Sequence, residues 1–261
     1  FYDLSDQKRT AAHIHHLAYF DALTDLPNRL LFNDRCAQAL ETAERDGKSL
    51  ALLFLDLDRF KYVNDTLGHP VGDELLCRVA RRLTQGLRRS DTVARLGGDE
   101  FNLLMQNCRG QECARRLAAK IIRLFEKPFV VMGHRLDIRT SIGISLYPND
   151  GTDTETLVKN ADLAMYQAKE HGRGQFVFYE PRFGEQVQER LFLENELRDA
   201  LRRDELTLHY QPQFDLQSGR IVGSEALLRW RHPTRGMIPP AKFIPVAEDT
   251  GLIVEIGEWV L

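Results

Sequence analysis

The sequence is poor in cysteine, and its four cysteines form no pattern typical of metal binding or disulfide pairing. They are Cys36, Cys77, Cys108 and Cys113, and none belongs to a CxxC motif or lies at ligand spacing from a histidine. A disulfide framework and a structural zinc site are therefore not expected. A reducing compartment fits this composition best.

Long apolar runs are also missing. A membrane-spanning helix needs about 20 consecutive apolar residues, and no segment of the sequence provides them. Residues 1–6 lack the basic stretch followed by an apolar stretch that marks a signal peptide. We therefore expect a cytoplasmic protein, or the cytoplasmic part of a membrane-anchored one, with no direct membrane contact from this segment. Because the first residue is Phe1 and not Met, we expect the segment to belong to a longer protein.

The chain has no excess of basic charge. Lys and Arg total 35 and Asp and Glu total 38, so the formal net charge is -3. A chain of this charge is poorly suited to non-specific nucleic-acid binding, and we expect no nucleic-acid partner. A polyphosphate ligand would have to be neutralised locally, by a few placed cations or by a metal ion. The hydrophobic content of 43% is sufficient for a packed core.

Hydrophobic periodicity predicts an α+β sandwich in which helices cover a mixed sheet. A Gly97–Gly98 pair between two strand-like runs predicts a tight hairpin turn. Pro181 then interrupts the pattern, and a second region begins with a helix over 183–203 and strands at 206–210 and 223–230. In the first region we predict helices at 6–20, 30–43, 73–88, 111–126 and 154–170, and strands at 50–55, 93–96, 101–105, 137–146 and 175–179.

A histidine cluster lies on the first predicted helix. His13, His15 and His16 have the residue type of a metal site, but no carboxylate or cysteine lies at ligand spacing from them. The alternative, a polar helix face, is favoured.

Three charged groups together describe a metal-assisted phosphoryl-transfer site. Asp56 ends a buried strand, and Asp99 and Glu100 follow the Gly-Gly turn, so the two segments can share one hard divalent cation if the fold brings them together. Lys169 and Arg173 lie four residues apart at a helix end and would hold phosphates. The loop 57–61 would offer backbone N–H groups to phosphate oxygens. The alternative is a set of ordinary solvated charges at turns and helix ends.

The string RLGGDEF at residues 95–101 resembles the motif that names the GGDEF family of diguanylate cyclases. Further segments resemble the family in the same order, over about residues 17–180, so we expect a GGDEF domain at 18–180. One position departs from the family pattern, because Asp25 stands where glycine is common. The matching segments are DALTDLPNR at 21–29, DLDRFK at 56–61, NDTLGH at 64–69, GD at 72–73, AD at 161–162, MYQAK at 165–169 and GRG at 172–174.

The resemblance implies a bacterial nucleotidyltransferase that condenses two GTP molecules into cyclic di-GMP and pyrophosphate. Each subunit would hold one GTP, so a homodimer is expected for turnover, with Mg²⁺ or Mn²⁺ as cofactor. The implied metal ligands are Asp56, the backbone carbonyl of Leu57, and Asp99. Asp99 would also accept the proton of the 3′-hydroxyl, Glu100 would shape the metal site, and Lys61 would stabilise charge on the phosphates.

The implied substrate contacts lie on three segments. Asn64 and Asp73 would read the guanine edge, which would select against adenine. The alternative for these two residues is to cap a turn and a helix, and the alternative for Lys169 and Arg173 is a solvated helix end that favours the helix dipole. The full implied set for GTP is Phe60, Lys61, Asn64, Asp73, Lys169 and Arg173.

Five residues separate an RxxD sequence, residues 88–91, from Gly97, at the place where the family has its inhibitory product site. By this resemblance Arg88 and Asp91 would bind cyclic di-GMP, with Arg88 on phosphate or guanine and Asp91 on the guanine edge. The alternative is a plain surface ion pair between them.

Residues 206–261 resemble the start of an EAL domain, the family that hydrolyses cyclic di-GMP. The matching segments are YQP at 210–212, EALLRW at 225–230 and FIPVAE at 243–248. Gln211 belongs to the first of them, Glu225 is implied as a metal ligand and Arg229 as a phosphate contact. The family fold is a TIM-like barrel of about 250 residues, so residues 181–261 are expected to form its first strands and helices. Phosphodiesterase activity is not expected from this chain, although the intact protein can have it.

The front of the chain resembles a signalling connection. Residues 3–9, DLSDQKR, look like the exit of a PAS-like sensor domain, and residues 1–17 are expected to form a linker helix. The intact protein would then join a sensor, a cyclase and a phosphodiesterase domain. A catalytically weak, GTP-binding module that regulates the attached EAL domain is the alternative function.

Overall fold

The computed structural model describes residues 16–88, 90–108 and 110–261. The chain divides after Phe183 into two compact units, Phe1–Phe183 and Gly184–Leu261. Most of the predicted linker helix, with His13 and His15, lies outside the described residues. Residues 16–19 are helical, and His16 contacts Asp25 through a 2.7 Å hydrogen bond. Among the described residues no helix is both long enough and apolar enough to cross a bilayer.

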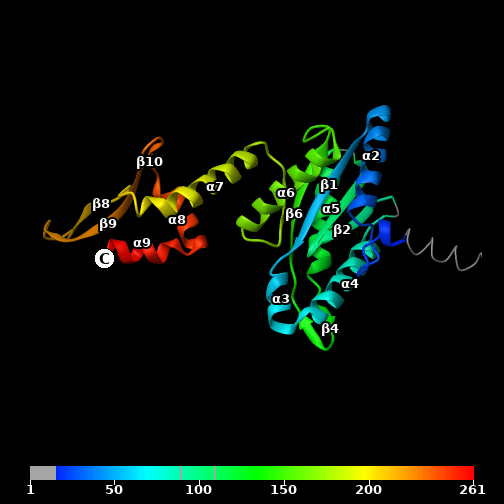
Figure 1. Cartoon of the computed structure of the whole chain (residues 1–261), viewed down its shortest axis with the longest axis horizontal. Helices are drawn as coiled ribbons and strands as arrows, with labels where there is room; N and C mark the ends of the chain where they lie inside the picture. Colours follow the sequence, from blue (N-terminus) through cyan, green and yellow to red (C-terminus); the bar gives the residue numbers. More distant parts are fainter. Residues whose placement is uncertain (1–15, 89, 109) are drawn as a thin grey trace, which may run out of the picture. The chain divides into compact units, whose positions relative to one another are not determined.

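The first unit is built on a five-stranded mixed sheet with the strand order β2-β3-β1-β6-β7 (Figure 1). The central strand β1 pairs antiparallel with β3 and β6, and β7 pairs parallel with β6. Eight of the nine residues of β1 are buried, because helices cover the strand on both faces. The strands are β1 (Ser49–Leu57), β2 (Thr92–Gly97), β3 (Glu100–Cys108), β6 (Thr140–Tyr147) and β7 (Phe176–Phe178).

Alternating residues of β1 supply two separate cores, one for each face of the sheet. Leu50, Leu52 and Phe54 pack under α2 (Arg29–Asp46) and α6 (Thr154–Glu170). The residues between them pack against the other face, under α3 (Phe60–Leu67), α4 (His69–Gly86) and α5 (Gln111–Phe125). This arrangement confirms the predicted α+β sandwich.

Two elements of the first unit, the helix α3 and a short hairpin after α5, are not predicted by the hydrophobic periodicity, and α4 begins earlier than predicted. The helix predicted over 73–88 begins at His69, because Pro70 is accepted in the first turn of a helix and Gly68 ends the separate helix α3 at a positive φ of 85°. A short hairpin, β4 (Phe129–Val131) with β5 (His134–Leu136), follows α5. Both α3 and this hairpin are too short for a clear periodic signal.

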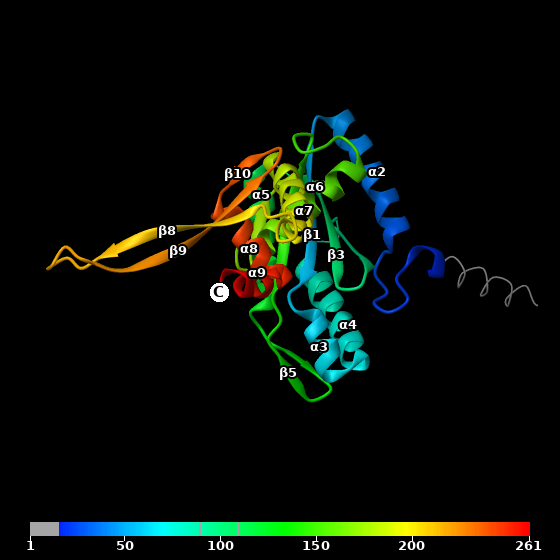
Figure 2. The same ribbon diagram turned by 60° about the vertical axis from the view of Figure 1, so that its left-hand side comes forward.

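The second unit contains three helices around a three-stranded antiparallel sheet with the order β10-β9-β8. Figure 2 shows β8 and β9 as a long two-stranded ribbon. These strands do not close into a barrel, as expected for the first part of an EAL domain. The elements are α7 (Arg182–Ala200), β8 (Leu206–Phe214), β9 (Ile221–His232), β10 (Gly236–Ile238), α8 (Pro240–Thr250) and α9 (Leu252–Val260).

Candidate functional site

The structure brings the two acidic segments of the first unit together at one end of the sheet. Asp56, near the end of β1, is the direct partner of Glu100, the first residue of β3. Side chains of directly opposed residues in an antiparallel pair lie on the same face, which is the face covered by α2 and α6. Gly97 and Gly98, with φ of 148° and 50°, form the turn that presents Asp99 beside this pair.

Helix α6 places a lysine on this acidic pair. The Nζ atom of Lys169, in the last turn of α6, lies 2.7 Å from Oδ1 of Asp56. The side chain of Asp56 is 10% exposed and that of Lys169 is 27% exposed. The ion pair is therefore largely shielded from water, and its electrostatic interaction is stronger than that of a surface pair.

One lysine does not neutralise the cluster. Burial raises the pKa of Asp56 to about 6, and the nearby charges of Asp99 and Asp58 add to this effect against the opposing effect of Lys169. Burial also raises the pKa of Glu100, and the carboxylates of Asp162 on α6 and Asp99 raise it further. Excess negative charge at a strand end therefore favours the binding of another cation.

Carboxylate oxygens from Asp56, Asp99 and Glu100 are the donors that a hard divalent cation prefers, so these residues fit a Mg²⁺ or Mn²⁺ ion. Within residues 16–88, 90–108 and 110–261, however, no three Asp, Glu, His or Cys side chains are already gathered in a coordinating arrangement. In this arrangement the Nζ atom of Lys169 lies against Oδ1 of Asp56.

Asp58 is buried and ties the strand end to the turn after α6. Its two carboxylate oxygens accept hydrogen bonds from Oγ of Ser141, at 2.7 Å, and from the backbone N–H of Gly174, at 3.0 Å. Arg173 precedes this glycine in a left-handed conformation with φ of 62° and is exposed. Asp58 therefore fixes the position of the turn that carries Arg173, a role that its place in the motif did not indicate.

A second unpredicted group holds the Gly-Gly turn from outside. The guanidinium of Arg95 donates to the carbonyl of Gly98, from Nε at 3.0 Å and from Nη2 at 2.8 Å. Its Nη1 also contacts both oxygens of Asp21, at 2.9 and 3.1 Å. Thr24 donates its N–H and hydroxyl to the same carboxylate, which helps to lower the pKa of Asp21 against the effect of burial. Through Arg95, Asp21 near the start of the domain is thereby linked to the Gly97–Gly98 turn.

Asn64 and Asp73 lie at a close contact between α3 and α4. A Cβ atom on Gly72 would lie 1.9 Å from Oδ1 of Asn64, so only glycine at this position leaves the amide its place. This Oδ1 is buried and has no hydrogen-bond partner among the residues that the structure describes, an arrangement that suits a ligand N–H donor. Asp73 is exposed beside it. The alternative that Asp73 caps a helix is wrong, because α4 begins four residues earlier and its N-cap is Gly68.

The remaining predicted GTP contacts lie at the start of α3. Phe60 is 7% exposed and its side chain belongs to the core. Lys61 is exposed in the first turn of the helix. The turn between β1 and α3 contains Arg59 with φ of 61°, an uncommon conformation for a non-glycine residue.

Arg88 and Asp91 form a turn between α4 and β2, separate in sequence from the acidic cluster. Oδ2 of Asp91 accepts from the backbone N–H of Arg88 at 3.2 Å, and the Asp91 N–H donates to the Arg88 carbonyl at 3.0 Å. In the part of the chain that the structure describes, no ion pair joins their side chains. The plain ion pair considered above is therefore not present.

The predicted EAL residues of the second unit lie on the open ribbon. Gln211 of β8 is the direct partner of Glu225 of β9, and both are exposed. Arg229 lies four residues further along β9, hence on the same face, and its Nη1 donates to the carbonyl of Leu228 at 2.9 Å.

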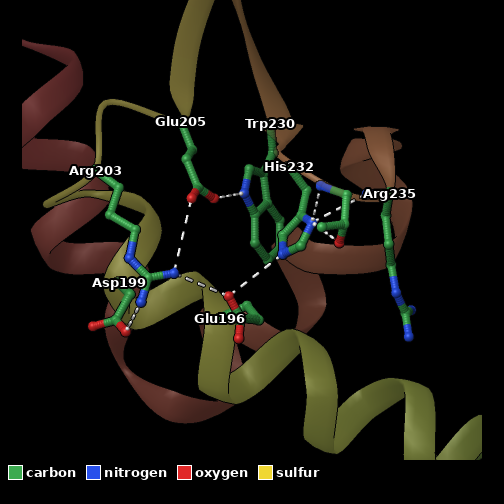
Figure 3. Close-up of polar contacts among 8 residues, drawn as sticks. Glu196, Asp199, Arg203, Glu205, Trp230, His232 and Arg235 are labelled. Atoms are coloured by element: carbon green, nitrogen blue, oxygen red, sulfur yellow. Dashed lines mark hydrogen bonds and ion pairs between the residues drawn. The ribbon is translucent and has the colours of Figure 1, made fainter.

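Beyond Arg229 the same strand enters a buried polar network (Figure 3). The indole N–H of Trp230, which is fully buried, donates to Oε2 of Glu205 at 3.0 Å. Nδ1 of His232 accepts from the backbone N–H groups of Thr234 and Arg235, both at 3.2 Å. These contacts hold the C-terminal end of β9 in place. Glu225 lies nearer the other end of the strand, on the ribbon formed with β8.

Comparison with known proteins identifies two families along the chain. The family described as "Diguanylate cyclase, GGDEF domain" matches residues 18–175, and the EAL domain family matches residues 194–261. The isolated GGDEF domain of YfiN from Pseudomonas aeruginosa, a solved structure, has 41% identity and a TM-score of 0.64, and the match covers 65% of this chain and 99% of that one.

Two curated relatives, both from Pseudomonas aeruginosa, match nearly the whole chain. The bifunctional diguanylate cyclase/cyclic di-GMP phosphodiesterase MucR is 50% identical over 94% of this chain and 36% of its own length. The cyclic di-GMP phosphodiesterase NbdA is 44% identical over 96% of this chain and 32% of its own length. The chain thus spans about a third of the length of these relatives.

Proposed function

This chain belongs to the GGDEF family of diguanylate cyclase domains, with part of an EAL domain after it, and we propose that it condenses two GTP molecules into cyclic di-GMP and pyrophosphate. Cyclic di-GMP signalling is the setting that both families share. We propose the division into a linker helix at 1–17, a GGDEF domain at 18–180 and the beginning of an EAL domain at 181–261.

The observation that carries this proposal is the acidic cluster at the end of β1. Asp56 and Glu100 are direct partners on the adjacent strands β1 and β3, and Asp99 lies beside them. The cluster retains excess negative charge although Lys169 contacts it. Such a cluster suits a metal-bound triphosphate, whose phosphates also need the cations at the end of α6.

Asp56, Asp99 and the Leu57 carbonyl would hold a divalent cation, with Glu100 shaping its surroundings. When bound, a divalent cation polarises the α-phosphate and lowers the pKa of the attacking 3′-hydroxyl. Asp99 would take the proton of that hydroxyl, at a carboxylate oxygen.

The other residues would bind and orient GTP. Lys61, Lys169 and Arg173 would contact the phosphates, with the backbone N–H groups at the start of α3 beside Phe60. The unpartnered Oδ1 of Asn64 would accept from the guanine amino group, and Asp73 from the remaining donors of the same edge. Adenine lacks this donor pattern, so the pair would select guanine.

Turnover would need two subunits, because each chain contributes one such site and the product contains two guanylates. Arg88 and Asp91 would bind the product and inhibit the enzyme. We propose the bacterial cytoplasm as the location, because GTP is available there, and a PAS-like sensor and a complete EAL domain would flank the segment in the intact protein.

The test is incubation of the purified chain with GTP and Mg²⁺, with cyclic di-GMP measured by chromatography. We expect product from the wild type and a loss of about a thousandfold in Asp99→Ala, since a metal ligand and proton acceptor are both removed. Glu41→Ala, which removes an exposed carboxylate of α2, should retain wild-type activity. Turnover that survives Asp99→Ala would refute the assignment of the site.

A second candidate function is a GTP-binding regulatory module for the attached EAL domain. It is favoured by the 44% identity to a protein named only as a cyclic di-GMP phosphodiesterase. Tight GTP binding without product in the same assay would support this function, and product formation would exclude it.

A further inference from the structure

We propose that Lys169 is a built-in counter-ion for Asp56, which opposes metal binding in the nucleotide-free protein and moves to the nucleotide phosphates when metal and nucleotide bind together. This role rests on the proposed function, because it assumes that Asp56 is a metal ligand. It adds a second role for a residue whose expected function is phosphate contact alone.

The ion pair between Lys169 and Asp56 is strong enough to oppose the binding of a metal ion to Asp56. The 2.7 Å separation of Nζ and Oδ1 joins two side chains that are 27% and 10% exposed, so the pair is much less screened than a surface salt bridge. A divalent cation on the same carboxylate would lie a few ångströms from the ammonium and would be repelled by it. Lysine and metal therefore compete for Asp56.

The helix that carries the lysine is fixed, so this competition is built into the fold. A Cβ atom on Gly143 of β6 would lie 1.8 Å from the carbonyl oxygen of Ala161 and 2.2 Å from the N atom of Met165. Helix α6 thus packs directly on β6, with no side chain at this position between them. The hydrogen bond from the backbone N–H of Gly174 to the carboxylate of Asp58 also ties the turn after the helix to the end of β1.

The lysine side chain can nevertheless exchange partners without movement of the helix. Its four-carbon stem is flexible and ends in a compact charge, whereas the backbone of α6 is held by its packing. A triphosphate beside Asp56 would offer the ammonium a more highly charged anion. Departure of the lysine would then free Oδ1 for the metal, so nucleotide and metal would each strengthen the binding of the other.

The experiment measures Mn²⁺ binding to the nucleotide-free chain by electron paramagnetic resonance. We expect Lys169→Gln to bind Mn²⁺ about tenfold more tightly than the wild type, because a cation is removed from the contested carboxylate. Lys169→Arg keeps the charge and should stay within about twofold of the wild type. Lys159→Gln, on an exposed position of the same helix, is the matched control and should be unchanged. If Lys169→Gln does not fold, Lys169→Met provides a neutral side chain of similar length.

Two further measurements identify the site and the coupling. The gain in Lys169→Gln should disappear when Asp56→Asn is added, because the tighter Mn²⁺ ion is expected on that carboxylate. A non-hydrolysable GTP analogue should raise the Mn²⁺ affinity of the wild type by a larger factor than that of Lys169→Gln.

Unchanged Mn²⁺ affinity in Lys169→Gln, or a gain that persists with Asp56→Asn, would overturn the counter-ion role. Either result together with cyclic di-GMP production by the wild type would leave the proposed function intact. The opposite combination, a gain in Lys169→Gln with no GTP binding or product in the wild type, would overturn the proposed function and leave the counter-ion role in place.

Discussion

Asp56 of the first unit and Glu225 of the second are both carboxylates on a strand, opposite a polar residue of the neighbouring strand, but their surroundings differ. Asp56 is 10% exposed, lies under α6 and is paired with Lys169. Glu225 is exposed on the ribbon of β8 and β9, opposite Gln211. A sequence motif supplies similar ligand atoms in both units, but Asp56 has packed surroundings that raise its pKa and a lysine beside it, whereas Glu225 lies exposed on the ribbon.

The largest expected difference between the two carboxylates is in catalysis. Asp56→Ala should lower cyclic di-GMP formation by about a thousandfold, because it removes the proposed metal ligand. Glu225→Ala, in the other compact unit, should leave this activity within about twofold of the wild type. Initial rates with GTP and Mg²⁺ measure both. Equal losses in the two variants would contradict the assignment of the site to the first unit.

The next expected effect concerns stability and reverses the comparison, because the second unit does have a buried polar network at the other end of β9. Trp230→Phe should destabilise this unit by about 2 kcal/mol, since it leaves the buried Glu205 carboxylate without its indole donor. Calorimetric unfolding measures the change. Trp259→Phe, at a position 40% exposed, is the control and should change stability by less than about 0.5 kcal/mol. A shift of the first unit's transition in Trp230→Phe would show that the units do not unfold independently.

A smaller effect is expected from pH. Folding raises the pKa of Asp56 from 3.8 to about 6, so between about pH 4 and pH 6 the folded state keeps a proton that the unfolded state releases. The free energy of unfolding of the first unit should therefore fall as pH rises through this window, and Asp56→Asn should reduce that fall by about 1 kcal/mol. Urea unfolding at pH 4 and pH 7 measures it, with the exposed Glu225→Gln as control. A steeper fall in Asp56→Asn would contradict the direction of the shift.

The smallest expected effect is shared by both units. Asp25 in the first and Asp204 in the second adopt a left-handed conformation, with φ of 61° and 53°. Glycine accepts this conformation without steric cost, so Asp25→Gly and Asp204→Gly should each stabilise their own unit by about 0.5 kcal/mol. The exposed pair of Asp25 with His16 contributes little against this gain. Thermal unfolding of both variants checks the prediction, and a loss of stability in either would show that its side-chain contacts outweigh the backbone strain.

The sequence predicted the elements with strong patterns and the motifs that lie on them. The buried run 50–55 became β1, and the Gly-Gly hairpin follows in the predicted place. Contacts between distant segments could not be predicted in this way. The hydrogen bond from Arg95 to Asp21 joins residues 74 positions apart. The ion pair of Lys169 with Asp56 depends on how α6 packs on β6. Neither follows from residue spacing, because each depends on the three-dimensional packing of helices on the sheet.

Gly72 shows how much a missing side chain can decide. One methyl group at this position would occupy the place of the Asn64 amide oxygen, at a separation of 1.9 Å. In any relative that carries alanine or a larger residue there, the amide has to turn elsewhere, and the proposed contact of Asn64 with the guanine edge would be lost even if every charged residue of the motif were retained. Such a protein would look intact by its acidic signature and would still lack one of the two proposed contacts for guanine.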